Sequence, residues 1–277
     1  MKQHKHKKKL GFIGFGNMAE AIAAGLINKK IINPNDMLAL ELNPKRAKAV
    51  QKKYKINIAT SIESLFNQTH TIFLCVKPQN IPDILPTLRN FYNNQLMISV
   101  VTGIKTKNYL AHLGPKAKII RVMPNTPALI GHGTAAYFAH KNVSATHKKK
   151  CEQYFNSVGT IIPIKNEALI DVVTALSGSG PAFVYQFAQS LINSGIKLGL
   201  PAKTAKHLVL QTLEGATQMM KISKDSPQQL TNKVTSKGGT TLAGLSILNK
   251  KGFTKTVEAC IVGATKRAGV LSRLFKA

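Results

Sequence analysis

A strand, a glycine-rich turn and a helix near the N-terminus restrict the fold of this chain more than any other feature. The sequence Gly14-Phe15-Gly16-Asn17-Met18-Ala19 follows a strand predicted at residues 10–13 and opens a helix predicted at residues 18–28. In this setting the first glycine makes a tight turn, the second leaves space for a pyrophosphate, and the alanine lets the helix pack close to the strand. The phosphates would meet free N–H groups at the helix N-terminus. The pattern therefore predicts a dinucleotide site formed by Gly14, Phe15, Gly16, Asn17 and Met18.

Short β-branched runs alternate with helical patterns through the first part of the chain. Strands are predicted at residues 10–13, 37–42, 71–76, 96–101, 118–123, 134–138 and 160–164, and helices at residues 18–28, 44–54, 61–66, 81–91, 105–113 and 144–158. Strands that alternate with helices are typical of an α/β fold with a parallel, doubly wound sheet.

The pattern changes after Ile164, because apolar residues then recur only at helical spacing. We therefore expect a basic disordered tail at residues 1–9, a dinucleotide-binding domain at residues 10–164 and an α-helical domain at residues 165–277. The helices predicted at residues 182–198 and 202–220 carry apolar side chains on more than one face, which favours a subunit interface. In the first of them these are Phe183, Val184, Phe187, Leu191 and Ile192.

The chain of 277 residues has a formal net charge of +28, which raises nucleic acid as a possible partner. Most basic residues are scattered singly, however, and no basic stripe is interleaved with aromatic residues, so we expect no specific nucleic acid. Cys75, Cys151 and Cys260 are odd in number and far apart, which fits a reducing compartment and argues against a zinc site. Without a signal peptide or an apolar stretch long enough to span a membrane, the sequence predicts a cytoplasmic protein with no bound metal.

The end of the second predicted strand carries opposing signals for the choice of dinucleotide. Glu41 would accept hydrogen bonds from the ribose diol of NADH, whereas Lys45 and Arg46, after Asn43, could pair with the 2′-phosphate of NADPH. A solvated first helical turn is an equally good interpretation of the two basic residues. The sequence therefore leaves NADP and NAD open as cofactors.

The run from Val234 to Thr241 contains Gly238-Gly239 within an otherwise helical half. A glycine pair destabilises a helix, so it indicates either a flexible turn or a place where backbone approaches a ligand. The helix that begins near Thr240 would then direct free N–H groups at an anion such as a carboxylate.

Five segments together resemble pyrroline-5-carboxylate reductase. They are the segment 11–19 around the glycine turn, Val76-Lys77-Pro78-Gln79, the segment 121–128 (RVMPNTPA), the segment 176–182 (LSGSGPA) and the segment 234–241. The resemblance covers nearly the whole chain from Leu10 onward. It implies a Rossmann-like sheet domain followed by an all-α C-terminal dimerisation domain, with a homodimer through the helical domain and a decamer of dimers as a larger assembly. It also implies reduction of the cyclic imine 1-pyrroline-5-carboxylate to L-proline by NADPH or NADH, the last step of proline biosynthesis.

The resemblance also implies roles for single residues. Thr241 would hydrogen-bond the ring nitrogen of the imine as the catalytic residue. The substrate carboxylate would meet Ser236, Gly238, Gly239 and Thr240, and the nicotinamide end of the cofactor would meet Val76, Lys77, Pro78, Met123, Pro124 and Asn125. For Thr241 the alternative is a first-turn hydroxyl that bonds its own backbone, and the segment 177–181 could equally be a capped helix start.

This chain departs from the family pattern at Lys237, where proline is usual, which leaves the rigidity of that loop open. Two other functions remain as alternatives. A β-hydroxyacid dehydrogenase would need a catalytic lysine, for which Lys197 and Lys206 are candidates without the accompanying motif. A non-catalytic protein that binds dinucleotide or nucleic acid would show binding with steep salt dependence and no turnover.

Overall fold

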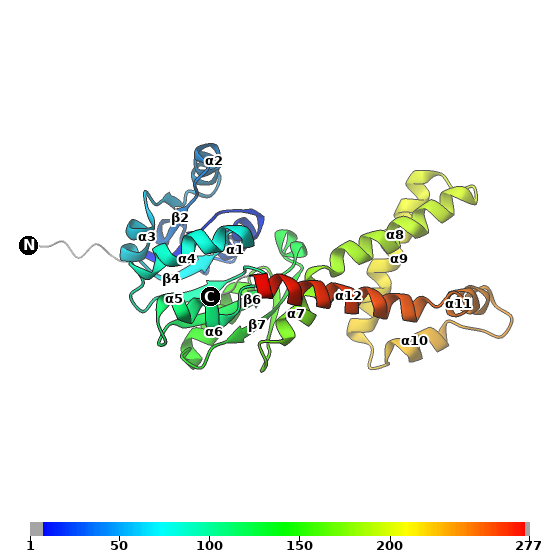
Figure 1. Cartoon of the computed structure of the whole chain (residues 1–277). Helices are drawn as coiled ribbons and strands as arrows, with labels where there is room; N and C mark the ends of the chain where they lie inside the picture. The colour runs from blue at the N-terminus through cyan, green and yellow to red at the C-terminus, as the bar shows by residue number, and fades with distance from the viewer. Residues whose placement is uncertain (1–7, 275–277) are drawn as a thin grey trace, which may run out of the picture. The chain divides into compact units, whose positions relative to one another are not determined.

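The computed structural model describes residues 8–274, which form two compact units (Figure 1). The first, here called the sheet unit, runs to Ser179 and also includes the chain from Ala264 onward. The second, the helical unit, comprises Gly180–Gly263.

The sheet unit contains one eight-stranded sheet in the order β3-β2-β1-β4-β5-β6-β7-β8. Its strands are β1 (Lys8–Ile13), β2 (Met37–Leu40), β3 (Asn57–Ile58), β4 (Thr69–Leu74), β5 (Leu96–Ser99), β6 (Lys118–Met123), β7 (Gly133–Ala139) and β8 (Gly159–Pro163). The helices that connect them are α1 (Asn17–Asn28), α2 (Pro44–Tyr54), α3 (Ile62–Gln68), α4 (Ile81–Arg89), α5 (Thr106–Leu113) and α6 (Ala145–Phe155). This arrangement confirms the α/β, doubly wound class.

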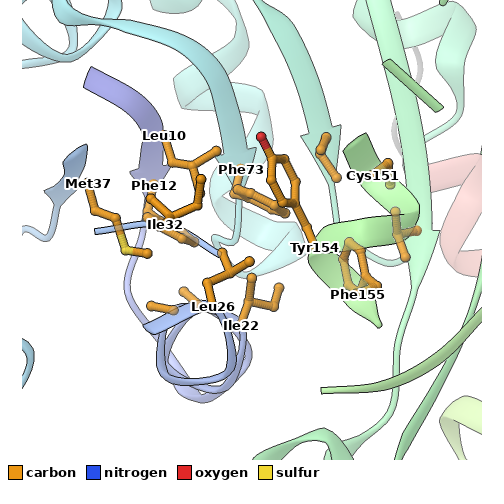
Figure 2. Packing of buried hydrophobic residues seen from close by; sticks show 14 of the residues in the cluster. Leu10, Phe12, Ile22, Leu26, Ile32, Met37, Phe73, Cys151, Tyr154 and Phe155 are labelled. Atoms are coloured by element: carbon orange, nitrogen blue, oxygen red, sulfur yellow. The ribbon is translucent and has the colours of Figure 1, made fainter. Parts of the chain in front are cut away.

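Helices cover both faces of the sheet, because alternate residues of each strand face opposite sides. In β1, Leu10 and Phe12 join the core formed with α1 and α6, whereas Ile13 joins the core formed with α3, α4 and α5. Figure 2 shows the first of these cores, in which the rings of Phe12 and Phe73 stack with centroids 5.1 Å apart. Phe73 also packs against Tyr154 and Phe155 of α6. The two cores hold the carboxyl ends of β1, β4 and β6 at one edge of the sheet.

One prediction about the sheet is wrong in part, because β6 and β7 pair antiparallel while the other neighbouring strands pair parallel. The connection between β6 and β7 contains only the short 3-10 helix η3 (Thr126–Ile130). A parallel pair needs a crossover of about a dozen residues or more. The short connection therefore forces β7 to run back along β6.

The predicted N-terminal tail covers residues 1–9, and residues 1–7 of it lie outside the described part of the chain. Its last two residues do not belong to a tail, since β1 begins at Lys8 and pairs there with Thr69 of β4. The strand continues the ladder two residues further than the apolar run Leu10–Ile13 indicates. Backbone pairing can extend a strand beyond its apolar side chains, which is why the predicted strand began two residues too late.

The first compact unit extends beyond residue 164, where we predicted the helical domain to begin. Helix α7 (Leu169–Val173) and the π-helix η4 (Thr174–Gly178) follow β8 and still belong to the sheet unit. The end of α12 (Phe253–Leu274) belongs there too, and Ser272 donates a hydrogen bond to Asp171 at 3.2 Å. The compact units thus divide at Ser179, while the predicted division by function stays a prediction.

The helical unit consists of α8 (Gly180–Lys197), α9 (Ala202–Ile222), α10 (Pro227–Lys233), α11 (Thr240–Lys250) and the first part of α12. Helix α8 packs along α9, where Gly195 lies so close that an added Cβ would be 3.4 Å from Ala205 Cβ. Ala188 and Ala205 are the only buried apolar residues among Gly180–Gly263. A unit of this kind has little core of its own within one chain.

Candidate functional site

The glycine turn between β1 and α1 has the geometry that the sequence predicts. Gly14 has a φ of 78° and donates its N–H to the Leu40 carbonyl at 2.9 Å. A Cβ at this position would lie 3.0 Å from Val76 Cγ1 and 3.1 Å from the Cys75 carbonyl oxygen. Both the backbone conformation and the close neighbours therefore require glycine.

Gly16 leaves the N-terminus of α1 open. It is the N-cap residue, no side chain caps the helix, and a Cβ built on it would meet nothing within 4 Å. Phe15 is fully buried against Phe12 and anchors the turn, while Ala19 is fully buried beneath the helix. Free N–H groups at an open helix N-terminus form a site for a phosphate group.

Glu41 braces the glycine turn against the end of β2. Its two carboxylate oxygens accept hydrogen bonds from the N–H groups of Phe15, at 3.0 Å, and Asn43, at 2.9 Å. The sequence predicts contact between the Glu41 carboxylate and the cofactor ribose, and it does not predict these two bonds to the backbone. Since a carboxylate offers about four lone pairs, Glu41 keeps acceptor capacity for a ribose hydroxyl.

The basic residues after β2 differ in their surroundings. Asn43 caps α2 by accepting the Arg46 N–H at 3.1 Å, and Lys45 is exposed. Arg46 donates from Nε to the Phe15 carbonyl and from Nη2 to Glu20 at 3.1 Å. The structure thus brings Arg46 onto the glycine turn and leaves Lys45 at the surface.

Glu20 on α1 collects three donors from α2, a cluster that the sequence did not predict. Besides Arg46, it accepts hydrogen bonds from Lys53 Nζ at 2.9 Å and Tyr54 Oη at 2.7 Å. The bonds from Lys53 and then Tyr54 hold the pKa of Glu20 below its ordinary value. Helical spacing places Arg46, Lys53 and Tyr54 on neighbouring faces of α2, but nothing in the sequence indicates which acid they meet.

Two further predicted cofactor segments lie at the carboxyl ends of strands along the same edge. Lys77 follows β4, is exposed, and precedes the 3-10 helix η2 (Pro78–Asn80). Met123 ends β6, and the strand order places β4 beside β1 with β6 two positions further. Ligands of open α/β sheets bind at this edge.

Asn125 has a structural role that the sequence did not predict. Its amide Oδ1 accepts the Thr134 N–H at 2.9 Å, and Nδ2 donates to the Ser177 carbonyl at 3.2 Å. The Ser177 hydroxyl donates back to the Val173 carbonyl and so does not cap α8. Asn125 therefore ties the edge of the sheet to the π-helix η4.

In the helical unit, Ser236 to Gly239 form a tight turn before α11. The Gly239 N–H donates to the Ser236 carbonyl at 3.1 Å, and Gly238 has a φ of 74°. A Cβ at Gly239 would lie 2.4 Å from Ser236 Oγ, so the serine hydroxyl sits directly against the glycine backbone. Gly239 is the N-cap of α11, and no side chain caps the helix. The turn thus combines a hydroxyl with free N–H groups at one helix N-terminus.

The hydroxyl of Thr241 is not taken up by the helix backbone. Several helical threonines of this unit donate to the carbonyl four residues earlier; these are Thr212, Thr217, Thr231 and Thr256. Within residues 8–274, Thr241 has no such bond, and its side chain is half-buried. The self-bonded alternative does not describe this residue.

The two lysines considered for a β-hydroxyacid dehydrogenase lie on helices of the helical unit. Lys197 ends α8 and Lys206 lies on α9, and both are exposed. Residues 8–274 contain no group of three or more His, Cys, Asp or Glu that could hold a metal ion. Over the same part of the chain, no helix has the length and apolar character that a membrane crossing demands.

Comparison with known proteins gives consistent matches over the chain. Residues 167–271 match the family model described as pyrroline-5-carboxylate reductase dimerisation, and residues 9–103 match the model described as NADP oxidoreductase coenzyme F420-dependent. Pyrroline-5-carboxylate reductase of Synechocystis sp. is 36% identical over 95% of this chain and 98% of its own. Pyrroline-5-carboxylate reductase 2 of Bacillus subtilis is 32% identical over 97% of this chain and 96% of its own.

Solved structures agree with these matches. The pyrroline carboxylate reductase of Plasmodium falciparum with NADP bound superposes with a TM-score of 0.87 at 36% identity, over 95% of this chain and 98% of that one. The pyrroline-5-carboxylate reductase of Coxiella burnetii gives a TM-score of 0.89 at 30% identity, over 96% and 99%.

Proposed function

The chain belongs to the pyrroline-5-carboxylate reductase family, and on this premise we propose that it reduces 1-pyrroline-5-carboxylate to L-proline with NADP(H). The observation that carries this proposal is the open N-terminus of α1 at Gly16, set at the carboxyl edge of a doubly wound sheet. Such a position receives the pyrophosphate of a dinucleotide. The reaction completes proline biosynthesis.

The residues of the sheet unit fit the cofactor. The backbone around Gly14 and Gly16 would hold the pyrophosphate, Glu41 the ribose, and Lys45 with Arg46 the 2′-phosphate. The segments after β4 and β6, at Val76–Pro78 and Met123–Asn125, would line the nicotinamide end. When bound, NADPH supplies the hydride for the imine carbon.

The helical unit supplies candidate groups for the substrate. The Ser236 hydroxyl and the N–H groups of Gly239 and Thr240 would hold the substrate carboxylate, since a helix N-terminus favours an anion. The Thr241 hydroxyl would hydrogen-bond the ring nitrogen, which gains a proton as the carbon receives hydride. In support, Ser236 Oγ lies against Gly239 and the Thr241 hydroxyl is free of the helix backbone.

A homodimer through the helical unit would bury apolar side chains that this unit leaves exposed within one chain. Exposed apolar side chains on α8 and α9 include Val184, Tyr185, Phe187, Leu208 and Leu210, each at least 41% exposed. Apolar surface of this extent on packed helices is typical of an interface between subunits. We propose the dimer as the basic assembly, with a decamer of dimers as the larger form, in the cytoplasm, where free thiols such as Cys151 persist.

The test is an assay of imine-dependent NADPH and NADH oxidation by the purified chain. We expect oxidation that requires 1-pyrroline-5-carboxylate and yields proline. Dinucleotide reduction driven by β-hydroxyacids, with no imine turnover, would instead support the β-hydroxyacid dehydrogenase alternative. DNA binding with steep salt dependence and no turnover of either substrate would support a non-catalytic role.

A further inference from the structure

We propose that Glu20 is a positioning residue that fixes the Arg46 guanidinium for the 2′-phosphate of NADPH and so favours NADPH over NADH. Glu20 lies on α1, three residues beyond Asn17, which begins the helix, and no sequence motif of the site contains it. The inference rests on the proposed placement of the 2′-phosphate at Arg46, and the experiment below separates the two.

The geometry of Arg46 carries the first step. Nε donates to the Phe15 carbonyl and Nη2 donates to Glu20 Oε2, so one edge of the planar guanidinium is bound to α1 and its turn. Arginine has five N–H donors, and these two bonds use two of them. The other three donors remain for an anion, and the Arg46 side chain is 36% exposed.

Fixing a long side chain before a ligand arrives favours binding. An unrestrained arginine would lose rotamer freedom on binding a phosphate, whereas a guanidinium that is already oriented loses less. The Phe15 carbonyl alone gives one bond about which the group can rotate. The second bond, to Glu20, fixes the plane of the guanidinium relative to the glycine turn.

Glu20 is itself held in place from the other side. Lys53 Nζ and Tyr54 Oη both donate to Glu20 Oε1, which leaves Oε2 for Arg46. The Lys53 ammonium also lies 4.9 Å from the centroid of the Tyr54 ring. The carboxylate therefore has one oxygen for anchoring and one for positioning.

The charges around Glu20 make this arrangement compatible with an anionic ligand. A carboxylate beside a phosphate site would normally repel the phosphate. On α2, however, Lys45, Arg46 and Lys53 provide three positive charges, against Glu20 and the Glu41 carboxylate. The positive side chains therefore still outnumber the carboxylates near the proposed phosphate site, while Glu20 orients the Arg46 guanidinium.

The inference can be tested by binding alone, without turnover. Isothermal titration calorimetry would measure the affinity of the full-length protein for adenosine 2′,5′-bisphosphate and for 5′-AMP, which lacks the 2′-phosphate. The variants are Glu20→Ala, Glu20→Gln, Arg46→Ala and the double variant, with Glu63→Ala as a control that removes an exposed acid from α3.

We expect Glu20→Ala to weaken binding of the bisphosphate about two- to tenfold, the range for releasing one ordered side chain, and to leave 5′-AMP unchanged. Glu20→Gln, which keeps an acceptor oxygen, should lie between Glu20→Ala and the wild type. The Glu20→Ala effect should vanish in the Arg46→Ala background, because Glu20 acts through Arg46.

Unchanged or tighter bisphosphate binding by Glu20→Ala would overturn the inference, since Glu20 would then be neutral or repulsive. An equal loss for 5′-AMP would also overturn it, because Glu20 would then support the fold of the turn and not the 2′-phosphate. If Arg46→Ala alone leaves bisphosphate binding unchanged, the proposed placement of the phosphate is wrong as well.

Discussion

Arg121 Nη1 lies 2.7 Å from Oε1 of Glu167, so a buried arginine of β6 holds the chain where it leaves the sheet. The Arg121 side chain is only 4% exposed. Glu167 also accepts the Thr106 N–H at 2.6 Å and the Thr106 hydroxyl at 2.8 Å. One carboxylate thus joins β6, α5 and the residues before α7.

Breaking this ion pair from one side should destabilise the protein strongly. Glu167→Leu leaves a buried guanidinium without its counter-ion, which costs about 3–5 kcal/mol of unfolding free energy for a buried pair. Urea unfolding of wild type and variant would measure the difference. Glu63→Leu, at an exposed acid, should cost far less, and an equal loss at both sites would contradict the assigned role.

Much of the sheet unit could be predicted because its signals are local. The run at Leu10–Ile13 and the glycine turn after it specify a strand, a turn and a helix within twenty residues. Similarly, the helix predicted at residues 44–54 is α2, which the structure finds to begin at Pro44 after an asparagine cap. Features that depend on spacing within one element or one turn can be predicted from sequence.

Contacts between elements far apart in sequence could not be predicted. Glu20 meets Lys53 and Tyr54 across more than thirty residues, and Glu167 meets Arg121 across forty-six. A charged residue is normally solvated, so composition alone favours the surface for Glu20, Lys53, Arg121 and Glu167. The antiparallel β6–β7 pair belongs to the same class, because its direction is decided by the length of one connection.

Removal of the Thr241 hydroxyl should lower the turnover of the imine and leave cofactor affinity nearly unchanged. If the hydroxyl bonds the ring nitrogen as it gains a proton, Thr241→Ala should reduce kcat by about 10²-fold, as for loss of one donor aimed at developing charge. Steady-state kinetics together with NADP⁺ titration would measure both quantities. Thr241→Ser should keep most activity, and Thr217→Ala, which loses a hydroxyl bonded to the Leu213 carbonyl, serves as control. Unchanged turnover in Thr241→Ala would remove its proposed role.

Proline in place of Lys237 should stabilise the turn before α11. Ser236 to Gly239 form a turn closed by the Gly239 N–H, with Gly238 at a φ of 74° in the third position. This is the pattern of a type II turn, in which proline is common at the second position. Lys237→Pro should therefore raise unfolding free energy by about 0.4–1 kcal/mol, chiefly by restricting the unfolded chain. A fall in the midpoint of chemical denaturation would show that the backbone at residue 237 does not suit proline.

The balance of charges at the end of β2 should give an enzyme that accepts both dinucleotides, with NADPH modestly ahead. Arg46 and Lys45 favour the 2′-phosphate, while Glu41 keeps lone pairs for a ribose hydroxyl. The ratio of kcat/KM for NADPH and NADH measures the preference. Lys45→Ala should reduce this ratio, because it removes a positive charge that favours the 2′-phosphate. Since Lys45 is exposed and makes no bond that supports the turn, the change should act on the charge alone. A strong preference for NADH that Glu41→Ala abolishes would show that Glu41, and not the basic pair, decides the choice.

The stabilisation that Glu20 contributes should depend on pH in one direction. Hydrogen bonds from Lys53 and then Tyr54 hold its folded-state pKa below the ordinary value of 4.5. A carboxyl whose pKa is lowered by folding stabilises the protein above its unfolded pKa, and this contribution is lost as the pH falls through the folded pKa. The difference in unfolding free energy between wild type and Glu20→Gln should therefore be full at pH 7 and shrink below about pH 4.5. Urea titrations at a series of pH values would measure it, and because the Lys53 partner is 65% exposed we expect the difference to be small and to weaken with added salt. A difference that stays constant from pH 7 to pH 3 would mean that Glu20 contributes by packing rather than by charge.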